Sequence, residues 1–374
     1  MRAWDINFKM RVKADEPEIV TLVADCRAMA RVIRNIPITP GRQDRINRLN
    51  ILRAVRGTTG IEGSELTELE VGMILEASSK KMVLPASRKR EEQEVRNAQN
   101  VTDYVASQLT LHPNTELTEE LICKLHQLTT ESIEYQFNTP GKYRTISVTA
   151  GDYVPPIEIK EINKLMGQFI KWLNTGTPQD WDPIIRAIVT HFYVVSIHPF
   201  GDGNGRTSRA AESFLLYKAG INARGFYSLA NFYYRNRDEY FLLLNKVRFE
   251  TKGDLTPFVR FALRGLSEEL EEVNREVLYE VKQISFRDFA REKLQDKLDS
   301  KSGKRMLDLL IKLETGIVDV KSIRQNEHAI SKLYRGLTPR TLARDIAFLE
   351  NQSLIIVDKG KIAANINLME KFTS

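Results

Sequence analysis

The feature that most constrains the fold is an apolar run at positions 184–197, which reads IIRAIVTHFYVVSI. Apolar residues recur three and four apart, as in a helix, but nearly every other position is apolar too. Such a helix has almost no polar face to turn toward water. Asp182 and Pro183 precede the run and can supply an N-cap and a first-turn proline. We therefore expect a buried helix within 181–197.

Helical periodicity also dominates the rest of the chain, and alternating runs are few. The fold class is therefore mainly α. A helix should begin near Asn204 and stop at Gly220, and another helical stretch covers 255–299. The clearest further helical segments are 18–34, 45–56, 91–109, 118–131 and 157–174.

Length and composition are those of an ordinary globular protein. The 374 residues have room for two or three domains, and 42% are hydrophobic and 28% charged. The only cysteines, Cys26 and Cys123, form no CxxC motif, which argues against a disulfide framework or a zinc site and favours a reducing cytoplasm. No window approaches the roughly 18 apolar residues of a membrane span, so we expect neither secretion nor a membrane.

The C-terminal tail differs in composition from the rest. A short polar joint at 301–304 marks a boundary near residue 300, followed by helical segments at 305–314 and 320–333. Thr338 and Pro339 open a further helix, RTLARDIAFLEN. Two short strands, LIIV and KIAANI, are joined by a tight turn at 358–360. This order of elements is typical of a winged helix.

The basic excess of the chain, +6 overall, is concentrated in this tail, which has 13 Lys+Arg against 8 Asp+Glu. Arg340 and Arg344 are four apart on one helix face, suitable for phosphates or a DNA groove. Winged helices also dock proteins, and Arg340 with Asp345 and Glu350 would equally form a solvated face. The pattern leaves DNA binding and protein docking both open.

Residues 198–209, HPFGDGNGRTSR, form the segment with the strongest chemical character. Its three glycines expose backbone N–H groups and lead into a helix N-terminus, an arrangement suited to an anion. Arg206 and Arg209 share a helix face and can both reach a polyphosphate. Asp202 would repel phosphate unless Mg²⁺ lies between them, and His198 can accept a proton at neutral pH. Each feature alone has a structural explanation, but their combination indicates transfer of a phosphate-containing group.

This segment resembles the Fic (filamentation induced by cAMP) signature, His-x-Phe-x-Asp/Glu-Gly-Asn-Gly-Arg-x-x-Arg, at every specified position. The resemblance implies that His198 is the general base, that Phe200 anchors the loop, and that Asp202 holds Mg²⁺. It further implies nucleotide contacts from Asp202, Gly203, Asn204, Gly205, Arg206, Thr207, Ser208 and Arg209. Gly203 and Gly205 favour transfer of AMP over phosphorylation, since family members that phosphorylate depart from these glycines.

A second resemblance lies at 141–156, which mixes β-branched residues with glycine and ends in two prolines. The pattern alone predicts a short hairpin or an extended flap. It is similar to the Fic flap, which pairs with the target's backbone and covers the nucleotide. The positions facing the nucleotide would be Val148, Thr149, Ala150 and Gly151, where Ala150 replaces a larger residue.

Two positions beyond the loop also bear on the family resemblance. Tyr240 lies in a region similar to the family's base pocket, although the asparagine often found further along is not evident. His191, in the apolar helix, is interpreted as a packing residue. The resemblance therefore implies that Tyr240, and not His191, contacts the nucleotide.

Thr58 to Gly63, TTGIEG, resembles the Fic inhibitory motif Ser/Thr-x-x-x-Glu-Gly/Asn. A glutamate paired with Arg209 would keep that arginine from the γ-phosphate, so ATP would bind unproductively. Taken alone, Glu62 would be one more solvated acid. Beside a complete signature it is expected to be an inhibitory residue, and in some relatives the same glutamate supports removal of AMP.

The sequence thus predicts an autoinhibited protein adenylyltransferase that uses ATP and Mg²⁺ on Ser, Thr or Tyr hydroxyls of a target protein. Self-modification and a dimer are both compatible with it. The alternatives are a DNA-binding regulator with a nucleotide-sensing core, or a Fic enzyme that removes AMP or uses another nucleotide. The predicted domains are an N-terminal helical region with the inhibitory motif (1–95), a Fic catalytic domain (96–285), and a linker helix with the winged helix (286–374).

Overall fold

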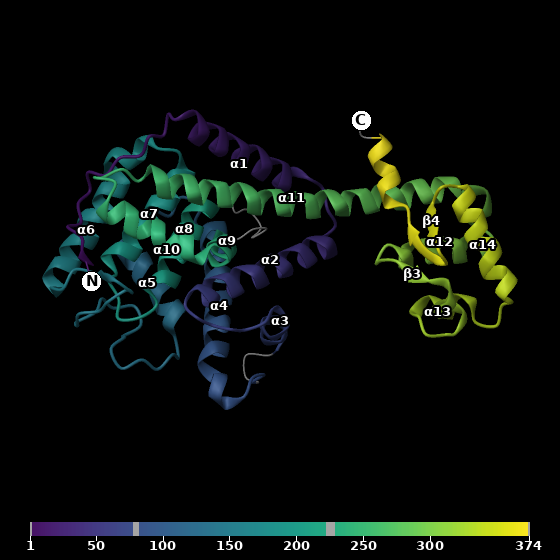
Figure 1. Cartoon of the computed structure of the whole chain (residues 1–374), viewed down its shortest axis with the longest axis horizontal. Coiled ribbons are helices and arrows are strands. Elements are labelled where there is room, and N and C mark those ends of the chain that lie inside the picture. Colours follow the sequence, from purple (N-terminus) through teal and green to yellow (C-terminus); the bar gives the residue numbers. More distant parts are fainter. Residues whose placement is uncertain (1, 78–81, 222–228, 373–374) are drawn as a thin grey trace. The chain divides into compact units, whose positions relative to one another are not determined.

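The computed structural model describes residues 2–77, 82–221 and 229–372. The chain divides into two compact units, Met1–Asn274 and Arg275–Ser374. The division falls inside one continuous helix, α11 (Thr256–Lys293), and the predicted boundary at 285/286 lies eleven residues further along it (Figure 1). The other predicted boundary, at 95/96, falls inside helix α4, so the N-terminal region and the predicted catalytic domain belong to one compact unit.

The first unit is built almost entirely of helices (Figure 1). Its only described sheet is a parallel pair, β1 (Arg2–Ala3) with β2 (Tyr153–Val154). The five clearest predicted helices are confirmed as α1, α2, α4, α5 and α6, each within a few residues of the predicted ends. The helices before α11 are α1 (Pro17–Asn35), α2 (Pro40–Ile61), α3 (Glu68–Glu76), η1 (Ala86–Arg88), α4 (Lys89–Leu111), α5 (Glu119–Thr130), α6 (Ile159–Thr175), η2 (Thr177–Asp180), α7 (Pro183–Ile197), α8 (Asn204–Lys218), α9 (Leu229–Arg235) and α10 (Arg237–Phe249).

Helix α7 is the buried helix that the sequence predicts. Asp182 caps it, because its carboxylate accepts the backbone N–H of Ile184 at 2.9 Å, and Pro183 occupies the first turn. From Ile184 onward every residue of α7 is buried except Arg186. It packs along α8 and against α6. This burial fixes the loop between α7 and α8 at the centre of the unit.

Helix α2 carries the predicted inhibitory motif at its C-terminal end. It packs against α4, α8 and α9, and the loop that follows it leads into α3. A small apolar cluster of Val55, Leu66, Val71, Ile74 and Val95 ties α2, α3 and α4 together. The end of α2 is thereby held close to α8, although the two segments are more than 140 residues apart in sequence.

The second unit contains a three-stranded antiparallel sheet in the order β3-β5-β4. Lys359 and Gly360, both with positive φ, form the tight turn between β4 and β5 that the sequence predicts. The elements follow the predicted order, and the winged-helix assignment itself stays a prediction. After α11 they are η4 (Gln295–Lys297), α12 (Lys301–Leu313), β3 (Val318–Asp319), α13 (Val320–Arg324), η5 (Ala329–Tyr334), α14 (Pro339–Asn351), β4 (Ile355–Asp358), β5 (Lys361–Ala364) and η6 (Ile366–Phe372).

Three expectations for the tail need correction. The helix expected at 320–333 is interrupted, because Asn326 adopts a left-handed conformation (φ 60°) and His328 caps a new 3₁₀ turn at Ile330. The helix expected to reach residue 299 ends at Lys293, with α11. Asp345 is not part of a solvated face but is 2% exposed.

No helix in the described ranges is long and apolar enough to cross a membrane.

Asp345 provides a test of the second unit's polar core. Its carboxylate accepts from Arg305 Nε at 2.8 Å and from the Tyr334 hydroxyl at 3.2 Å. Asp345→Ala would leave a largely buried guanidinium without its partner, and we expect the unit to lose about 3 kcal/mol of stability. Hydrogen exchange of the α12 and α14 amides in the full chain measures this. Glu350→Ala, at an exposed position of α14, should change it by less than about 0.5 kcal/mol, and equal exchange in both variants would contradict the prediction.

Candidate active site

The loop between α7 and α8 has two left-handed residues at its ends. His198 ends α7 with φ 53°, and Gly203 begins α8 with φ 74°. A side chain at Gly203 would also collide with Thr130, whose Cγ2 would lie 2.7 Å from an added Cβ. Glycine is therefore required here by both conformation and space. The loop turns sharply enough that α8 begins with its free N–H groups at the site.

Hydrogen bonds within the loop and ring stacking against α5 stabilise the loop. Asn204 exchanges two hydrogen bonds with the backbone of Phe200, at 2.8 and 2.9 Å. Phe200 is fully buried and stacks on His126 of α5 with ring centroids 3.7 Å apart. Because the Asn204 side chain is used in these hydrogen bonds, only its backbone is available to a nucleotide.

His126 is a functional residue that the sequence reasoning missed. Its Nδ1 accepts the N–H of Gly141, so Nε2 carries the proton and donates to the Asp202 carbonyl at 3.0 Å. Burial lowers the pKa of His126 to about 4, which keeps it neutral. The residue joins α5, the flap and the loop, and no sequence motif marks it.

His198 has the protonation state that a general base needs. Its Nδ1 lies 3.1 Å from the Val195 carbonyl, and since a carbonyl only accepts, Nδ1 carries the proton. Nε2 keeps its lone pair and has no hydrogen-bond partner among the described residues. Burial, reinforced by the nearby Arg248 and Arg144, lowers the pKa of His198 to about 4. The imidazole is therefore neutral at physiological pH.

Glu62 lies directly over the N-terminus of α8. A Cβ added to Gly205 would be 2.2 Å from Glu62 Oε1, so only glycine permits this approach. Burial opposes the charge on Glu62, but Arg209 and Arg206 outweigh it and hold the pKa of Glu62 below its usual value. An ionised carboxylate of the chain thus occupies the region where a helix N-terminus attracts anions.

Arg209 is held by both ends of the inhibitory motif. Its Nη2 donates to Glu62 Oε1 at 2.6 Å and to the Thr58 carbonyl at 3.0 Å, and its Nε donates to Thr58 Oγ1 at 2.9 Å. The arginine is 3% exposed, whereas Glu62 is 36% exposed. Arg209 Nη1 is buried without a hydrogen-bond partner. The predicted Glu62–Arg209 pair is present in the structure.

Asp202 and Arg206 are also paired, with each other and with α4. Asp202 Oδ2 lies 3.3 Å from Arg206 Nη2 and 2.9 Å from Arg90 Nη2. Arg206 Nη1 in turn lies 3.0 Å from Glu94 Oε1. The described residues contain no group of three or more metal-binding side chains. A cation at Asp202 would therefore need phosphate oxygens or water as its other ligands, which is the usual way proteins hold Mg²⁺.

The flap region is only partly a hairpin. Ala150 and Tyr153 pair across a turn at Gly151, and β2 then pairs with β1. Val148 and Thr149 belong to no helix or strand and, within the described ranges, have no strand partner. Arg144 fixes the flap to the loop, because its Nε donates to the His198 carbonyl at 2.8 Å. This role of Arg144 was not predicted from the sequence.

Three other predicted contact residues are buried. Thr207 and Ser208 are fully buried in α8, and Ser208 donates to the Gly205 carbonyl. Tyr240 is 1% exposed, and its hydroxyl lies 2.8 Å from His191 Nε2. His191 also meets the buried Glu212 at 3.1 Å. Tyr240 thus belongs to an internal polar network and offers no exposed surface to a nucleotide base. His191 is a buried, hydrogen-bonded core residue, which agrees with its interpretation as a packing residue.

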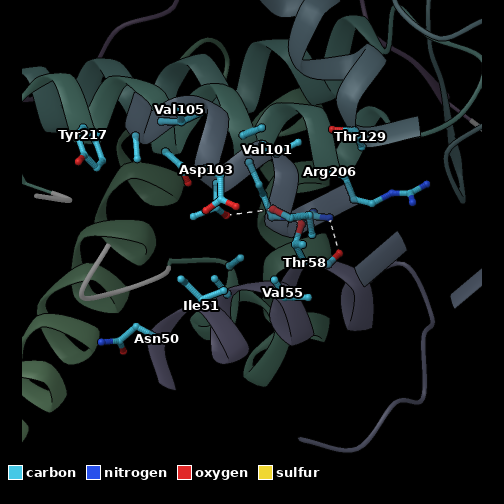
Figure 2. A pocket seen from close by; sticks show the side chains of 18 of the residues that line it. Asn50, Ile51, Val55, Thr58, Val101, Asp103, Val105, Thr129, Arg206 and Tyr217 are labelled. Atoms are coloured by element: carbon cyan, nitrogen blue, oxygen red, sulfur yellow. Dashed lines mark hydrogen bonds between the residues drawn. The ribbon is translucent and has the colours of Figure 1, made fainter. Parts of the chain in front are cut away.

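A cavity of about 320 Å³ lies next to Arg206 and Arg209. Figure 2 shows Ile51, Val55 and Thr58 of α2 facing Val101 and Val105 of α4 across it. Arg206 and Arg209 also contribute to its lining. Thr58, the first residue of the predicted inhibitory motif, therefore lines the same cavity as the two arginines.

Comparison with known proteins agrees with this geometry. The Fic/DOC family profile matches residues 116–216. The chain carries a Fic/DOC domain. The Fic signature lies in this domain, whereas Glu62 and Arg90 precede it and reach its arginines and Asp202 from outside.

Curated relatives match over a limited part of their length. The protein adenylyltransferase Fic of Nematostella vectensis is 31% identical over 187 residues, 49% of this chain and 40% of that protein. The protein adenylyltransferase Fic of Aedes aegypti is 36% identical over 121 residues, 32% of this chain and 22% of that protein. The chain thus spans less than half the length of these relatives.

Solved structures share the fold. A Fic family protein from Desulfovibrio desulfuricans has a TM-score of 0.56 at 20% identity and covers 93% of this chain and 96% of its own. Fic-1 from C. elegans has a TM-score of 0.54 at 21% identity, and the match covers 69% of this chain and 71% of the C. elegans chain. Both likenesses concern the fold alone.

The protonation state of His198 is directly testable. Since its pKa is lowered to about 4, the imidazole should stay neutral from pH 7.5 down to 5.5 in the nucleotide-free protein. NMR titration of ¹⁵N-labelled histidines, with His198→Ala to assign the signal, measures this. A midpoint above pH 6 would contradict the burial argument.

Proposed function

We propose that this protein is a protein adenylyltransferase that transfers AMP from ATP to a Ser, Thr or Tyr hydroxyl of a target protein. The observation that carries the proposal is a neutral His198 with a free Nε2 on the same loop that leads into a glycine-rich helix N-terminus flanked by two arginines. The names of the curated relatives support the same activity.

In the proposed reaction the target hydroxyl attacks the α-phosphorus of ATP. His198 Nε2 takes the hydroxyl proton as the new O–P bond forms, and the bond between the α-phosphorus and the bridging oxygen breaks. The products are the AMP-modified side chain and pyrophosphate. The Nδ1–H bond to the Val195 carbonyl orients the ring and stabilises the charge that the imidazole gains.

The phosphates would be held by the backbone N–H groups at the start of α8 and by the two arginines. Arg206 and Arg209 lie one turn apart on α8, so both can reach a polyphosphate above its N-terminus. Asp202 would hold Mg²⁺, which when bound neutralises charge on the phosphate oxygens. The residues present fit this role, since Asp202 is a carboxylate beside cationic donors and close to the anion-binding backbone.

The target would be recognised by strand addition to the flap. Val148 and Thr149 support this, because within the described ranges their backbone has no strand partner, whereas β2 already pairs with β1. Main-chain pairing of a target segment there would present its hydroxyl near His198, whose carbonyl is tied to the flap through Arg144.

The proposed enzyme is inhibited by Glu62. As long as Glu62 and Thr58 occupy Arg209, the arginine cannot also bind a γ-phosphate, and the carboxylate itself repels one. Glu62 is the more exposed partner and lies at the end of α2, so it can leave while Arg209 stays in place. Motion of the end of α2 is therefore the proposed route to activation.

Removing the carboxylate should activate the enzyme. A hydrogen bond between charged groups contributes about 1.5–3 kcal/mol, so Glu62→Gly should raise AMP transfer by about ten- to a hundredfold. The measurement is incorporation of label from α-labelled ATP with Mg²⁺ into protein, including the chain itself, for the wild type and Glu62→Gly. The other nucleoside triphosphates, labelled in the same way, test nucleotide choice.

Two controls make this experiment decisive. Glu65→Gly changes a nearby exposed acid and should leave the rate unchanged. Adding His198→Ala to Glu62→Gly should abolish labelling, and label that survives would refute the base. Release of AMP from modified protein in the wild type, lost in Glu62→Gly, would instead assign Glu62 to AMP removal.

The second unit is proposed to bind DNA through α14. Arg340 and Arg344 are both exposed on this helix, while Asp345, which would have opposed them, is buried with Arg305. We expect binding to duplex DNA that weakens as salt rises, and Arg340→Ala with Arg344→Ala should reduce both the affinity and the salt slope. A gel shift with salt titration measures this. A weak, salt-independent shift would favour protein docking by the winged helix.

A cytoplasmic location is part of the same proposal. Both cysteines are free thiols, Cys26 being buried and Cys123 half-buried. Two unpaired thiols are compatible with a reducing compartment.

A further inference from the structure

Helix α4 reaches into the site with two charged side chains that no motif marks. Arg90 Nη2 lies 2.9 Å from Asp202 Oδ2, and Arg90 Nε donates to Glu94 Oε1 at 3.1 Å. Glu94 Oε1 also lies 3.0 Å from Arg206 Nη1. Two carboxylates and two guanidinium groups thus alternate around one small ring. Asp202 and Arg206, the groups proposed to meet the metal and the phosphates, are neutralised within it.

Both oxygens of Asp202 already have donors. Oδ1 accepts the backbone N–H of Gly203 at 2.7 Å, and Oδ2 faces both Arg90 and Arg206. A divalent cation binds directly to a carboxylate oxygen and repels nearby guanidinium groups. Moving a guanidinium group away from Oδ2 should therefore favour binding of a cation at Asp202.

Burial decides which donor moves. The Gly203 N–H belongs to the left-handed residue that begins α8, so it cannot leave without changing the loop. Arg206 is 5% exposed and paired with the largely buried Glu94, so moving it would strand a buried charge. Arg90 is 49% exposed, and half-exposed ion pairs are weak. It can turn toward solvent, and its guanidinium carbon already lies 5.9 Å from the ring centroid of Tyr135.

We propose that Arg90 competes with the divalent cation for Asp202 and so sets how tightly the metal–nucleotide complex binds. The inference rests on the proposed function, in which Asp202 holds Mg²⁺. It is separate from the Glu62 pair, because Arg90 acts from α4 on Asp202 and Glu62 acts from α2 on Arg209. The site then has two restraints, one on the metal side and one on the phosphate side.

The test measures binding and requires no turnover. The full chain carrying Glu62→Gly is titrated by calorimetry with α,β-methylene-ATP, in Mg²⁺ and separately in EDTA. Arg90→Ala should tighten binding in Mg²⁺ by about three- to tenfold, as expected for loss of one competing charge. In EDTA it should not tighten binding. Arg90→Lys keeps the cation and should stay close to the parent.

Two further variants separate the possible failures. Arg88→Ala removes a nearby arginine that pairs with Glu70 and Glu91, and it should leave both affinities unchanged. Asp202→Asn should abolish the effect of Mg²⁺ on binding. If Mg²⁺ still strengthens binding in Asp202→Asn, the metal assignment of the proposed function is wrong.

The remaining outcomes concern Arg90 alone. If Asp202→Asn abolishes the Mg²⁺ effect while Arg90→Ala binds like the parent, the competition does not exist but the metal assignment stands. If Arg90→Ala binds more weakly in both Mg²⁺ and EDTA, Arg90 is a phosphate ligand and the inference is overturned.

Discussion

The charge balance around the start of α8 depends on the ion pair between Glu62 and Arg209. A helix N-terminus with free N–H groups and two arginines attracts an anion, and the chain supplies one from α2. Gly205 is essential to this contact, since any side chain there would collide with the carboxylate. The lack of a side chain at Gly205 leaves room for a phosphate. The same space admits the Glu62 carboxylate, which is proposed to exclude the phosphate.

This arrangement is possible because the surrounding structure is rigid. Helix α7 is buried from Ile184 to Ile197 except at Arg186, so His198 and the following loop cannot shift without disturbing the core. Asn204, Phe200 and His126 then hold the loop from inside, and Arg144 holds it from the flap. The groups that are proposed to move, Glu62 and Arg90, are the more exposed partners of their ion pairs.

Charged side chains of the site neutralise one another. Arg209 is matched by Glu62, Arg206 by Glu94, and Asp202 by Arg90 and Arg206. Buried charges require such partners, because an isolated charge in a protein interior is strongly unfavourable. Helices α2 and α4 provide partner charges for the groups that are proposed to bind the nucleotide and the metal.

The sequence alone was sufficient for local features with a local cause. Helix ends could be predicted from Asp182, Pro183 and the glycines. The chemistry of the loop could be predicted from residues that lie within twelve consecutive positions of the sequence. Even the Glu62–Arg209 pair was predictable, because a short motif resembles one in a known family. The interruption at Asn326 and the burial of Asp345 were not, since both depend on how α12, η5 and α14 pack.

Apart from the Glu62–Arg209 pair, the contacts of the site between residues far apart in the chain were decided by the tertiary structure. His126, Arg144, Arg90 and Glu94 lie on other segments and follow no motif, so only the packing of α4, α5 and the flap against the loop reveals them. The same packing turned Tyr240 inward to His191. Sequence determined which helices form and which chemistry the loop can carry, because these depend on neighbouring residues. The structure determined which charges meet, because that depends on distances which no local pattern encodes.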